Sequence, residues 1–324
     1  MTVNPSASLR VAICICTYHR ADSLRRLLER LVHIELGTLP PGAVNVIVVD
    51  NDPLEANATL CKDMAAQLAI AIHYVEEPRS GVTYARNTAV QQALELGSDF
   101  VALIDDDDLP EADWLLRLLQ RQAETGANLV FGRSQADPDM PDWVIKAGIF
   151  RDPDKPKNLA ASGRYGLPSY ASTCNVMAGR DILLRLNEQG PVFNHNFMYS
   201  GGEDKDMFVR ARKLGAKLES AEDSVVHQCH HSERLAANGL LRRGFKCGCS
   251  QVTMARTHGK SKRVMKLRLK SLLKLPLVAL TLPLTVFSRG LFLAHVYRMG
   301  KSAGVLYAAF TGRAINYYAR GEDP

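Results

Sequence analysis

The sequence predicts an α/β protein with a mostly parallel sheet flanked by helices, followed by a basic helical extension at the C-terminal end. The main observation is that short apolar runs alternate with helix-periodic segments across the first 132 residues. The apolar runs are continuous, as is typical of strands that are buried on both faces. With 324 residues, 46% of them hydrophobic, the chain can form one large domain and a smaller appendage.

The predicted elements follow one another in strict order. Expected strands cover residues 10–18, 43–52, 71–77, 99–105 and 128–132, and expected helices cover residues 21–34, 54–68, 83–96 and 111–124. The first helix shows the reason for these assignments, because Leu24, Leu27, Leu28 and Leu31 recur at helical spacing. An alternation of strand and helix implies neighbouring parallel strands that are joined by crossover helices.

Polar residues follow three of the expected strands at the end where parallel sheets bind ligands. The first strand ends in the sequence TYHR (residues 17–20), the second ends in Asp50, and the fourth ends in the four carboxylates Asp105–Asp108. Adjacent carboxylates repel one another, and the tip of a buried strand seldom holds four of them without a cation or a hydrogen-bond network. We therefore expect the three strand ends to converge on one site.

The acidic run is suited to a divalent metal, Mn²⁺ or Mg²⁺. Asp105 and Asp107 are separated by one residue and can both face a single cation. Both metals favour oxygen ligands and often bridge a carboxylate to a diphosphate. Arg86 supplies a positive charge near the same strand ends, and Asp50 can accept hydrogen bonds from a base or a ribose. A dinucleotide site and a P-loop are not expected, because the sequence lacks the glycine patterns that both require.

The C-terminal region differs in charge from the rest of the chain. Residues 235–320 contain 16 Lys or Arg and no Asp or Glu, whereas the first 234 residues carry a net charge of −8. Residues 275–287 are uncharged, but 13 residues are fewer than the roughly 20 that span a bilayer, and Pro276 and Pro283 argue against one straight helix. A region that lies in the interface of an anionic membrane fits this pattern better.

The expected domains are therefore residues 1–234, which would carry the active site, and residues 235–324, which would associate with a membrane. The start of the chain, MTVNPSASLR, lacks the apolar segment of a secretory signal. Seven scattered cysteines indicate reduced thiols rather than a disulfide framework. We expect a bacterial protein that is cytoplasmic and peripheral on the inner face of the plasma membrane.

Six short motifs, CTYHR, VVDND, ARN, LIDDDD, GGED and RARKLGA, occur in this order between residues 16 and 216. In order and spacing they resemble the family 2 glycosyltransferases of GT-A fold. The segment from residue 173 onward is further similar to the ExoM-like subgroup of bacterial exopolysaccharide glycosyltransferases. This resemblance implies a metal-dependent, inverting enzyme that moves a sugar from a nucleotide donor, expected to be a UDP-sugar. The implied acceptor is a lipid-linked or growing surface glycan.

The resemblance also assigns roles to individual residues. Asp204 matches the catalytic base, and Glu203 would position this base or the acceptor. Asp105 and Asp107 match the metal-binding D-x-D motif, with Asp107 the expected direct ligand. His227 lies where some relatives place a third metal ligand, and His230 and His231 are close alternatives. The nucleotide-sugar would contact Thr17, Tyr18, Arg20, Asp50, Arg86, Asn87, Asp105 and Asp106. Arg242 and Arg243 would correspond to a segment that binds pyrophosphate or the acceptor.

Two other functions remain open at this stage. A sugar-nucleotide pyrophosphorylase also combines an α/β sheet with carboxylate-bound metal, but it needs a glycine-rich basic loop after the first strand. A non-enzymatic nucleic-acid binder would explain the basic C-terminal region, but it would leave the acidic strand ends without a role. Because aromatic RNA-binding signatures are also missing, no nucleic-acid partner is expected.

Overall fold

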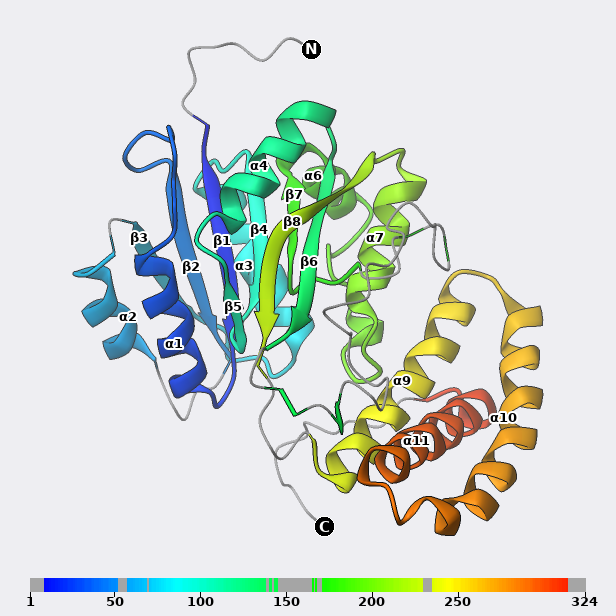
Figure 1. Ribbon diagram of the computed structural model, residues 1–324. Helices are drawn as coiled ribbons and strands as arrows, with labels where there is room; N and C mark the ends of the chain where they lie inside the picture. The colour runs from blue at the N-terminus through cyan, green and yellow to red at the C-terminus, as the bar shows by residue number, and fades with distance from the viewer. Residues whose placement is uncertain are drawn as a thin grey trace. The chain divides into compact units, whose positions relative to one another are not determined.

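The computed structural model describes residues 9–51, 57–68, 70–137, 140–141, 143–144, 165, 167, 171–229 and 235–313. These residues form two compact units (Figure 1). The first unit comprises Met1–Gln135, Pro156–Asn194 and Met207–Gln228, and the second comprises Ala136–Lys155, His195–Asp206 and Cys229–Pro324. This division differs from the expected boundary after residue 234, because two earlier segments are grouped with the C-terminal region.

The first unit contains an eight-stranded sheet in the order β3-β2-β1-β4-β7-β6-β8-β5. The strands are β1 (Val11–Thr17), β2 (Val44–Asp50), β3 (Ala71–Glu76), β4 (Phe100–Asp105), β5 (Asp108–Pro110), β6 (Leu129–Ala136), β7 (Val176–Gly179) and β8 (Leu218–Gln228). The predicted α/β fold with flanking helices is therefore confirmed. The helices of this unit are α1 (Ala21–Val32), α2 (Ala58–Ala65), α3 (Val82–Glu95), α4 (Trp114–Thr125), α6 (Arg180–Glu188) and the larger part of α7 (Glu203–Lys213).

The sheet is mixed, and only one half of it is the parallel sheet that the sequence predicts. Strands β3, β2, β1 and β4 pair in parallel. Strand β7 then lies between β4 and β6 and is antiparallel to both of them. Strand β5, which the sequence analysis did not predict, pairs antiparallel with β8. The sequence analysis expected a strand at β6 but missed β5, β7 and β8. Strands β5 and β7 are short, and all three come from segments without a strand–helix alternation.

Apolar side chains from both faces of the central strands form the core of this unit. Ile13 and Ile15 of β1 point to the same buried cluster as Leu24 of α1, Leu60 of α2 and Trp114 of α4. The opposite face is covered by other helices, since the Cys14 thiol donates to a carbonyl of α3 and Phe131 of β6 stacks edge-on against Phe208 of α7. The seven cysteines are all free thiols in this structure.

The second unit is mainly helical. It contains α9 (Ala237–Thr257), α10 (Ser261–Thr281), the short 3₁₀ helix η3 (Leu282–Thr285) and α11 (Arg289–Thr311). The chain turns at Pro283, as expected, but α10 continues through Pro276. Pro276 is exposed, so the carbonyl that loses its helical partner there can bond to water. Within the described residues, we find no helix that is both long and apolar enough to cross a membrane.

Glycines bring α9 and α11 into direct backbone contact. Each helix carries a G-x-x-x-G pattern, with Gly244 and Gly248 in α9 and Gly300 and Gly304 in α11. A Cβ atom added at any of the four would lie 2.1–2.3 Å from a backbone oxygen of the partner helix. Small residues at this spacing permit a close helix crossing. The sequence analysis did not identify this pattern.

We expect Gly248→Ala to lower the free energy of unfolding by about 1–3 kcal/mol, because the new methyl group must push the backbones of α9 and α11 apart. The carbonyl oxygen of Lys301 would lie 2.2 Å from the added Cβ. The free energy of unfolding, measured by urea denaturation, tests this expectation. Gly42→Ala is the matched control, since its Cβ would meet nothing within 4 Å and only its positive φ of 77° opposes the change. Equal losses for the two variants would contradict the proposed helix contact.

Candidate active site

The strand register aligns the polar ends of β1, β2 and β4 at one edge of the sheet. Thr17, the last residue of β1, pairs with Asp50, the last residue of β2. On the other side of β1, Cys16 pairs with Asp105, the last residue of β4. The structure therefore brings the three predicted strand ends together within the first unit. The turn after β1 also carries backbone strain, because His19 has a positive φ of 53°, which is uncommon for a residue with a side chain.

The middle of the acidic run is held by residues at the end of β1 and in the turn that follows it. Thr17 donates its hydroxyl to Asp106 over 2.9 Å, and Arg20 donates to Asp106 over 2.8 Å and to Asp107 over 3.1 Å. Both oxygens of the Asp106 carboxylate are thus engaged by protein groups. Burial raises the pKa of Asp106 to about 6, although the nearby positive charge of Arg20 opposes the shift. Asp106, which was predicted to contact the nucleotide-sugar, lies where it ties β1 to the end of β4.

Asp105 has a more open environment than Asp106 and Asp107. Its side chain is 39% exposed, and it accepts a hydrogen bond of 2.9 Å from Arg86 of α3. Arg86 is itself nearly buried, with its guanidinium group 5.8 Å from the ring centre of Phe193. A buried arginine that is fixed by an aromatic ring and a carboxylate is a rigid positive charge. This charge lies beside the carboxylate that is most open to solvent.

Asp50 is nearly fully buried and is held by a neighbouring strand and loop. One oxygen, Oδ2, accepts hydrogen bonds from the backbone and side-chain nitrogens of Asn57 over 2.9 and 3.1 Å, and from the Tyr74 hydroxyl over 2.9 Å. These bonds fix the orientation of the carboxylate. Burial raises the pKa of Tyr74, and its hydrogen bond to Asp50 raises this pKa further. Asp50 therefore has the fixed orientation that a base-recognising carboxylate needs.

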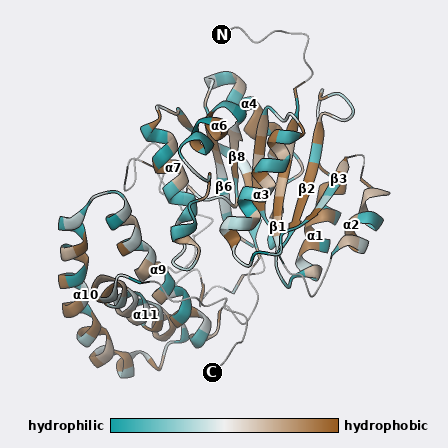
Figure 2. Ribbon diagram, turned by 180° about the vertical axis from the view of Figure 1, so that it is seen from behind, coloured by the Kyte–Doolittle hydropathy of each residue, from teal (hydrophilic) through white to brown (hydrophobic). Residues whose placement is uncertain are grey.

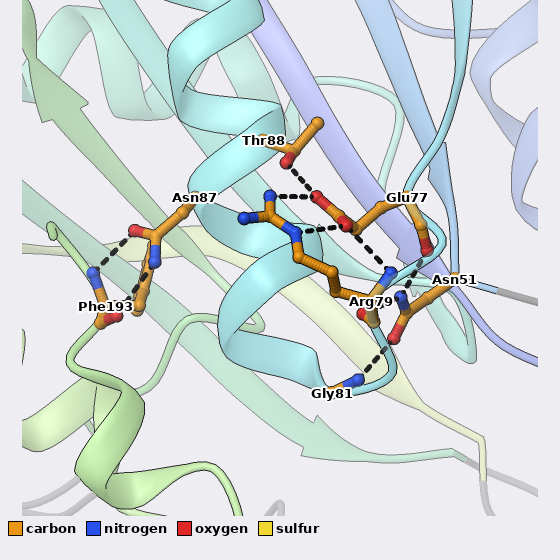
Figure 3. Close-up of polar contacts among 7 residues, drawn as sticks. All are labelled: Asn51, Glu77, Arg79, Gly81, Asn87, Thr88 and Phe193. Carbon is orange, nitrogen blue, oxygen red and sulfur yellow. Dashed lines mark hydrogen bonds and ion pairs between the residues drawn. The ribbon is translucent and has the colours of Figure 1, made fainter.

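A second network at the same edge was missed by the sequence reasoning (Figure 3). Asn51 donates to the backbone oxygens of Glu77 and Arg79 and accepts from the backbone nitrogen of Gly81. The Glu77 carboxylate in turn accepts two hydrogen bonds from the Arg79 guanidinium, of 2.8 and 2.7 Å. It also accepts a hydrogen bond of 2.6 Å from the Thr88 hydroxyl. The network shapes the turn between β3 and α3. The sequence signal was the PRSG turn next to an acidic residue, which resembled an ordinary loop.

Asn87 follows Arg86 directly in α3, but its side chain bonds to a different segment of the chain. Its side-chain amide exchanges two hydrogen bonds with the backbone of Phe193, of 2.9 and 2.8 Å (Figure 3). This reciprocal pair joins α3 to a segment 106 residues later in the chain. In the structure, Asn87 connects two parts of the fold. It holds the backbone of Phe193, whose ring lies against Arg86.

The predicted base lies at the start of α7, in the part of this helix that belongs to the second unit. Glu203 is buried, whereas Asp204 is partly exposed and accepts a hydrogen bond of 2.7 Å from the backbone nitrogen of Lys205. The preceding Gly201 and Gly202 have positive φ values of 68° and 98°. A side chain at residue 202 would also collide with Ser250 of α9, at 2.4 Å. Residue 202 must therefore be glycine for the turn to present Asp204.

Two buried polar side chains lie against each other at the same helix start within the second unit. His258, at the end of α9, places its Nε2 atom 3.0 Å from a carboxylate oxygen of Asp206, and the two side chains are 4% and 0% exposed. Arg242 and Arg243 also lie in α9, where Arg242 is exposed and Arg243 is half-buried. The predicted base and the predicted arginine pair are therefore both in the second unit, whereas the acidic run of β4 is in the first.

His227, the predicted third metal ligand, has other neighbours in the structure. It lies in β8, opposite Leu109 of β5. Its Nε2 atom is 3.2 Å from Glu111, and its Nδ1 atom is 3.5 Å from the Gln135 amide. Its alternatives, His230 and His231, lie outside the described residues. Across the part of the chain that the structure describes, no three His, Cys, Asp or Glu side chains gather as a metal site.

Asp105 and Asp107 nevertheless fit a divalent metal of the type that was predicted. Both are carboxylates at the end of one strand, and their charges are partly balanced by Arg86 and Arg20. Mg²⁺ and similar ions are usually bound by only one or two carboxylates, with the remaining positions filled by water and substrate phosphates. A set of two carboxylates beside two arginines is thus suited to a metal that arrives with a diphosphate. Tyr18, at the same edge, stacks edge-on against His19.

Comparison with known proteins gives consistent results at the levels of family and of sequence. Residues 12–185, more than half of the chain, match the family model described as glycosyl transferase family 2. The chain is also 30% identical over 259 residues to the succinoglycan biosynthesis protein ExoM of Rhizobium meliloti (strain 1021). This match covers 79% of the chain and 76% of that protein.

Two solved structures share the fold. A mannosyltransferase from Pyrobaculum calidifontis, solved with GDP-Man and Mn²⁺, superimposes with a TM-score of 0.60 at 19% identity, over 94% of this chain and 87% of that one. Residues 1–349 of TarS from S. aureus, solved with UDP, superimpose with a TM-score of 0.53 at 15% identity, over 94% and 92% of the two chains. These likenesses support the predicted GT-A fold.

The Glu77 network predicts a specific dependence of stability on pH. The bonds from Arg79 and Thr88 lower the pKa of Glu77 to about 2, against the opposing effect of burial. A lowered pKa means that the ionised form stabilises the fold above about pH 4.5, and that this contribution is lost as the pH falls toward 2. We expect Glu77→Gln to cost about 1–2 kcal/mol at pH 7, after allowance for solvent screening.

Urea denaturation of the wild type and of Glu77→Gln between pH 7 and pH 3 measures this effect. The difference between them should stay constant down to about pH 5 and shrink below pH 4.5. Glu76→Gln is the matched control, because Glu76 directly precedes Glu77 and is exposed at the end of β3. A difference that is independent of pH, or equal in the two variants, would contradict the role of the Glu77 carboxylate.

Proposed function

This chain belongs to glycosyl transferase family 2, and we propose that it transfers a sugar from a UDP-sugar to a glycan hydroxyl with inversion at the anomeric carbon. Membership of this family favours a glycosyltransferase over a pyrophosphorylase and over a nucleic-acid binder. The single observation that carries the detailed proposal is the alignment of Thr17, Asp50 and Asp105 at one sheet edge, where the half-buried Arg20 and the nearly buried Arg86 flank the carboxylates.

In this proposal the donor lies along the carboxyl ends of β2, β1 and β4. The fixed carboxylate of Asp50 accepts hydrogen bonds from the nucleobase or ribose, and Thr17 and Tyr18 border the nucleoside. Arg20 and Arg86 face the diphosphate and reduce the repulsion between its charge and the carboxylates. Both arginines are already oriented by Asp106, Asp107 and Asp105, so donor binding requires little further ordering of their side chains.

Asp105 and Asp107 would hold the divalent metal. When it is bound, the metal neutralises charge that develops on the departing diphosphate. Asp107, with a side chain that is 8% exposed, is the expected direct ligand, and the more open Asp105 contacts the metal or a sugar hydroxyl. The Mn²⁺ in the Pyrobaculum calidifontis structure supports this part of the proposal, without deciding between Mn²⁺ and Mg²⁺ for this chain.

Asp204 is the proposed base. The oxygen of the acceptor hydroxyl forms a bond to the anomeric carbon while the bond from that carbon to the diphosphate oxygen breaks. The hydroxyl proton passes to the Asp204 carboxylate, and the electron pair of the broken bond leaves with UDP. A hydroxyl has a pKa far above 7, so transfer needs a base within hydrogen-bonding reach of its proton. Glu203 is buried beside Asp204 and is proposed to hold it in position.

The acceptor is proposed to be a lipid-linked or growing bacterial surface glycan. The name of the similar R. meliloti protein supports a role in polysaccharide biosynthesis. The donor is less constrained, because one structural neighbour was solved with GDP-Man and the other with UDP. A direct comparison of donors is therefore the most informative experiment on the function.

We expect UDP-sugars with Mn²⁺ to raise the melting temperature of the chain more than GDP-sugars do, and chelation of the metal to remove this effect. Asp107→Asn should weaken the metal-dependent part of donor binding by about 10- to 100-fold, because it replaces a charged ligand. Asp63→Asn on the exposed surface of α2 is the control. Stronger protection by GDP-sugars would overturn the UDP assignment, and protection that survives chelation would overturn the metal assignment.

Removing the proposed base should separate chemistry from binding. We expect Asp204→Asn to reduce the rate of transfer by about 10²- to 10⁴-fold, because the amide cannot accept the proton, while donor affinity stays at the wild-type value. Radiolabelled transfer and donor protection measure the two quantities, again with Asp63→Asn as the control. A variant that transfers sugar at the wild-type rate would rule out Asp204 as the base. Retention of the donor's anomeric configuration in the product would rule out the single displacement.

A further inference from the structure

The second unit carries a continuous apolar surface that its own core does not use. We propose that this surface docks on an anionic phospholipid bilayer. We call it the outer stripe; it consists of Met265, Leu269, Leu272, Leu273, Leu277, Leu280, Leu284 and Phe287. All of these residues belong to α10, η3 or the short link that follows them. The proposal goes beyond the transfer reaction and does not depend on it.

The outer stripe lies on the side of α10 that faces away from the other helices. Its α10 members recur at spacings of three and four residues, so they share one face of the helix. A different set of residues packs inward: Ser271 is buried, and Val264 and Leu267 contact a cluster formed by α9 and α11. Helix α10 is therefore apolar on two faces, and only the inward face is needed to build the unit.

The outer stripe is most exposed where the chain leaves α10. Leu273, Leu280 and Leu284 are 76–77% exposed, and Phe287 is 96% exposed. Isolated apolar residues are normal on protein surfaces, but a large contiguous patch marks a site of interaction. Figure 2 shows the gradient along α10, from mixed polar and apolar turns at its start to mostly apolar turns near η3.

Lysines form a row beside the outer stripe. Lys262, Lys266, Lys270 and Lys274 recur every four residues, so they align along one flank of α10, and all four are exposed. Residues 275–288 then carry no charge, and residues 235–320 contain no acid. This pattern matches the layers of an anionic membrane, with lysines at the lipid phosphates and the leucines of the following turns among the acyl chains.

The charge pattern favours lipid over a second copy of the chain. A homodimer through the outer stripe would bring two lysine rows near each other without any acidic residue to balance them. A membrane with anionic headgroups supplies the missing negative charge and an apolar layer at the same time. Docking in the plane of the interface is also compatible with the absence, among the described residues, of a helix that could span a bilayer.

The test uses the full chain with vesicles of phosphatidylcholine alone or of phosphatidylcholine with 30% phosphatidylglycerol, separated by flotation. We expect binding to the anionic vesicles, with affinity falling as salt increases. Replacing Leu280, Leu284 and Phe287 with Gln, Gln and Ser should reduce affinity at least about 100-fold, because three large apolar side chains are lost. Replacing Lys266, Lys270 and Lys274 with Gln should reduce it by roughly 100-fold, and only for anionic vesicles.

Leu184→Gln is the matched control, because Leu184 is also an exposed leucine on a helix, but in α6 of the first unit. Circular dichroism and donor protection without vesicles establish that each variant is folded and still binds nucleotide. Unchanged vesicle binding in the apolar variant, or equal binding to neutral vesicles, would overturn the proposal. The proposal would also be overturned if sedimentation showed that the wild type forms a dimer and that only the apolar substitutions dissociate it. A variant that loses vesicle binding but still shows donor protection tests the docking surface alone. Its result is therefore distinguishable from a failure of the proposed transferase function.

Discussion

The structure depends most on how the charges at the end of β4 are balanced. Asp105, Asp106 and Asp107 are consecutive; Arg20, in the turn after β1, contacts Asp106 and Asp107, and Arg86 of α3 contacts Asp105. Without these contacts, mutual repulsion would favour a protonated or displaced carboxylate. Because Arg20 follows β1 and Arg86 lies in α3, the balance also fixes the positions of the strands and helices around the site. The proposed donor site is thus built from the interactions that stabilise this edge of the sheet.

The fold and the site differ in how far the sequence predicts them. The parallel half of the sheet was predictable because its strands are continuous apolar runs, and the resulting register places Thr17, Asp50 and Asp105 together as expected. The antiparallel half was not, since β5 has three residues and β7 has four, too few for a periodic signal. Likewise, sequence adjacency suggested one role for Arg86 and Asn87, but successive residues of a helix point in different directions. Only Arg86 reaches the acidic run.

Residues with a supporting role were the hardest to foresee. Asn51, Glu77 and His258 have no distinctive motif, because their importance comes from partners that are distant in the sequence. Pair contacts of this kind depend on the tertiary fold, which single-sequence patterns do not specify. The candidate base is an intermediate case. The GGED motif identified the turn, and the collision at residue 202 explains why a glycine is needed there.

The glycine contacts between α9 and α11 restrict how this region can diverge in evolution. Any side chain at Gly244, Gly248, Gly300 or Gly304 meets backbone, which cannot adjust by rotating about a side-chain bond. Compensation would require a simultaneous change in the opposite helix or a wider separation of both helices. Drift in related sequences should therefore spare these four positions and accumulate on the solvent-facing turns. Recombination that exchanges one of these helices between homologues should succeed only when both parents share the same glycine spacing.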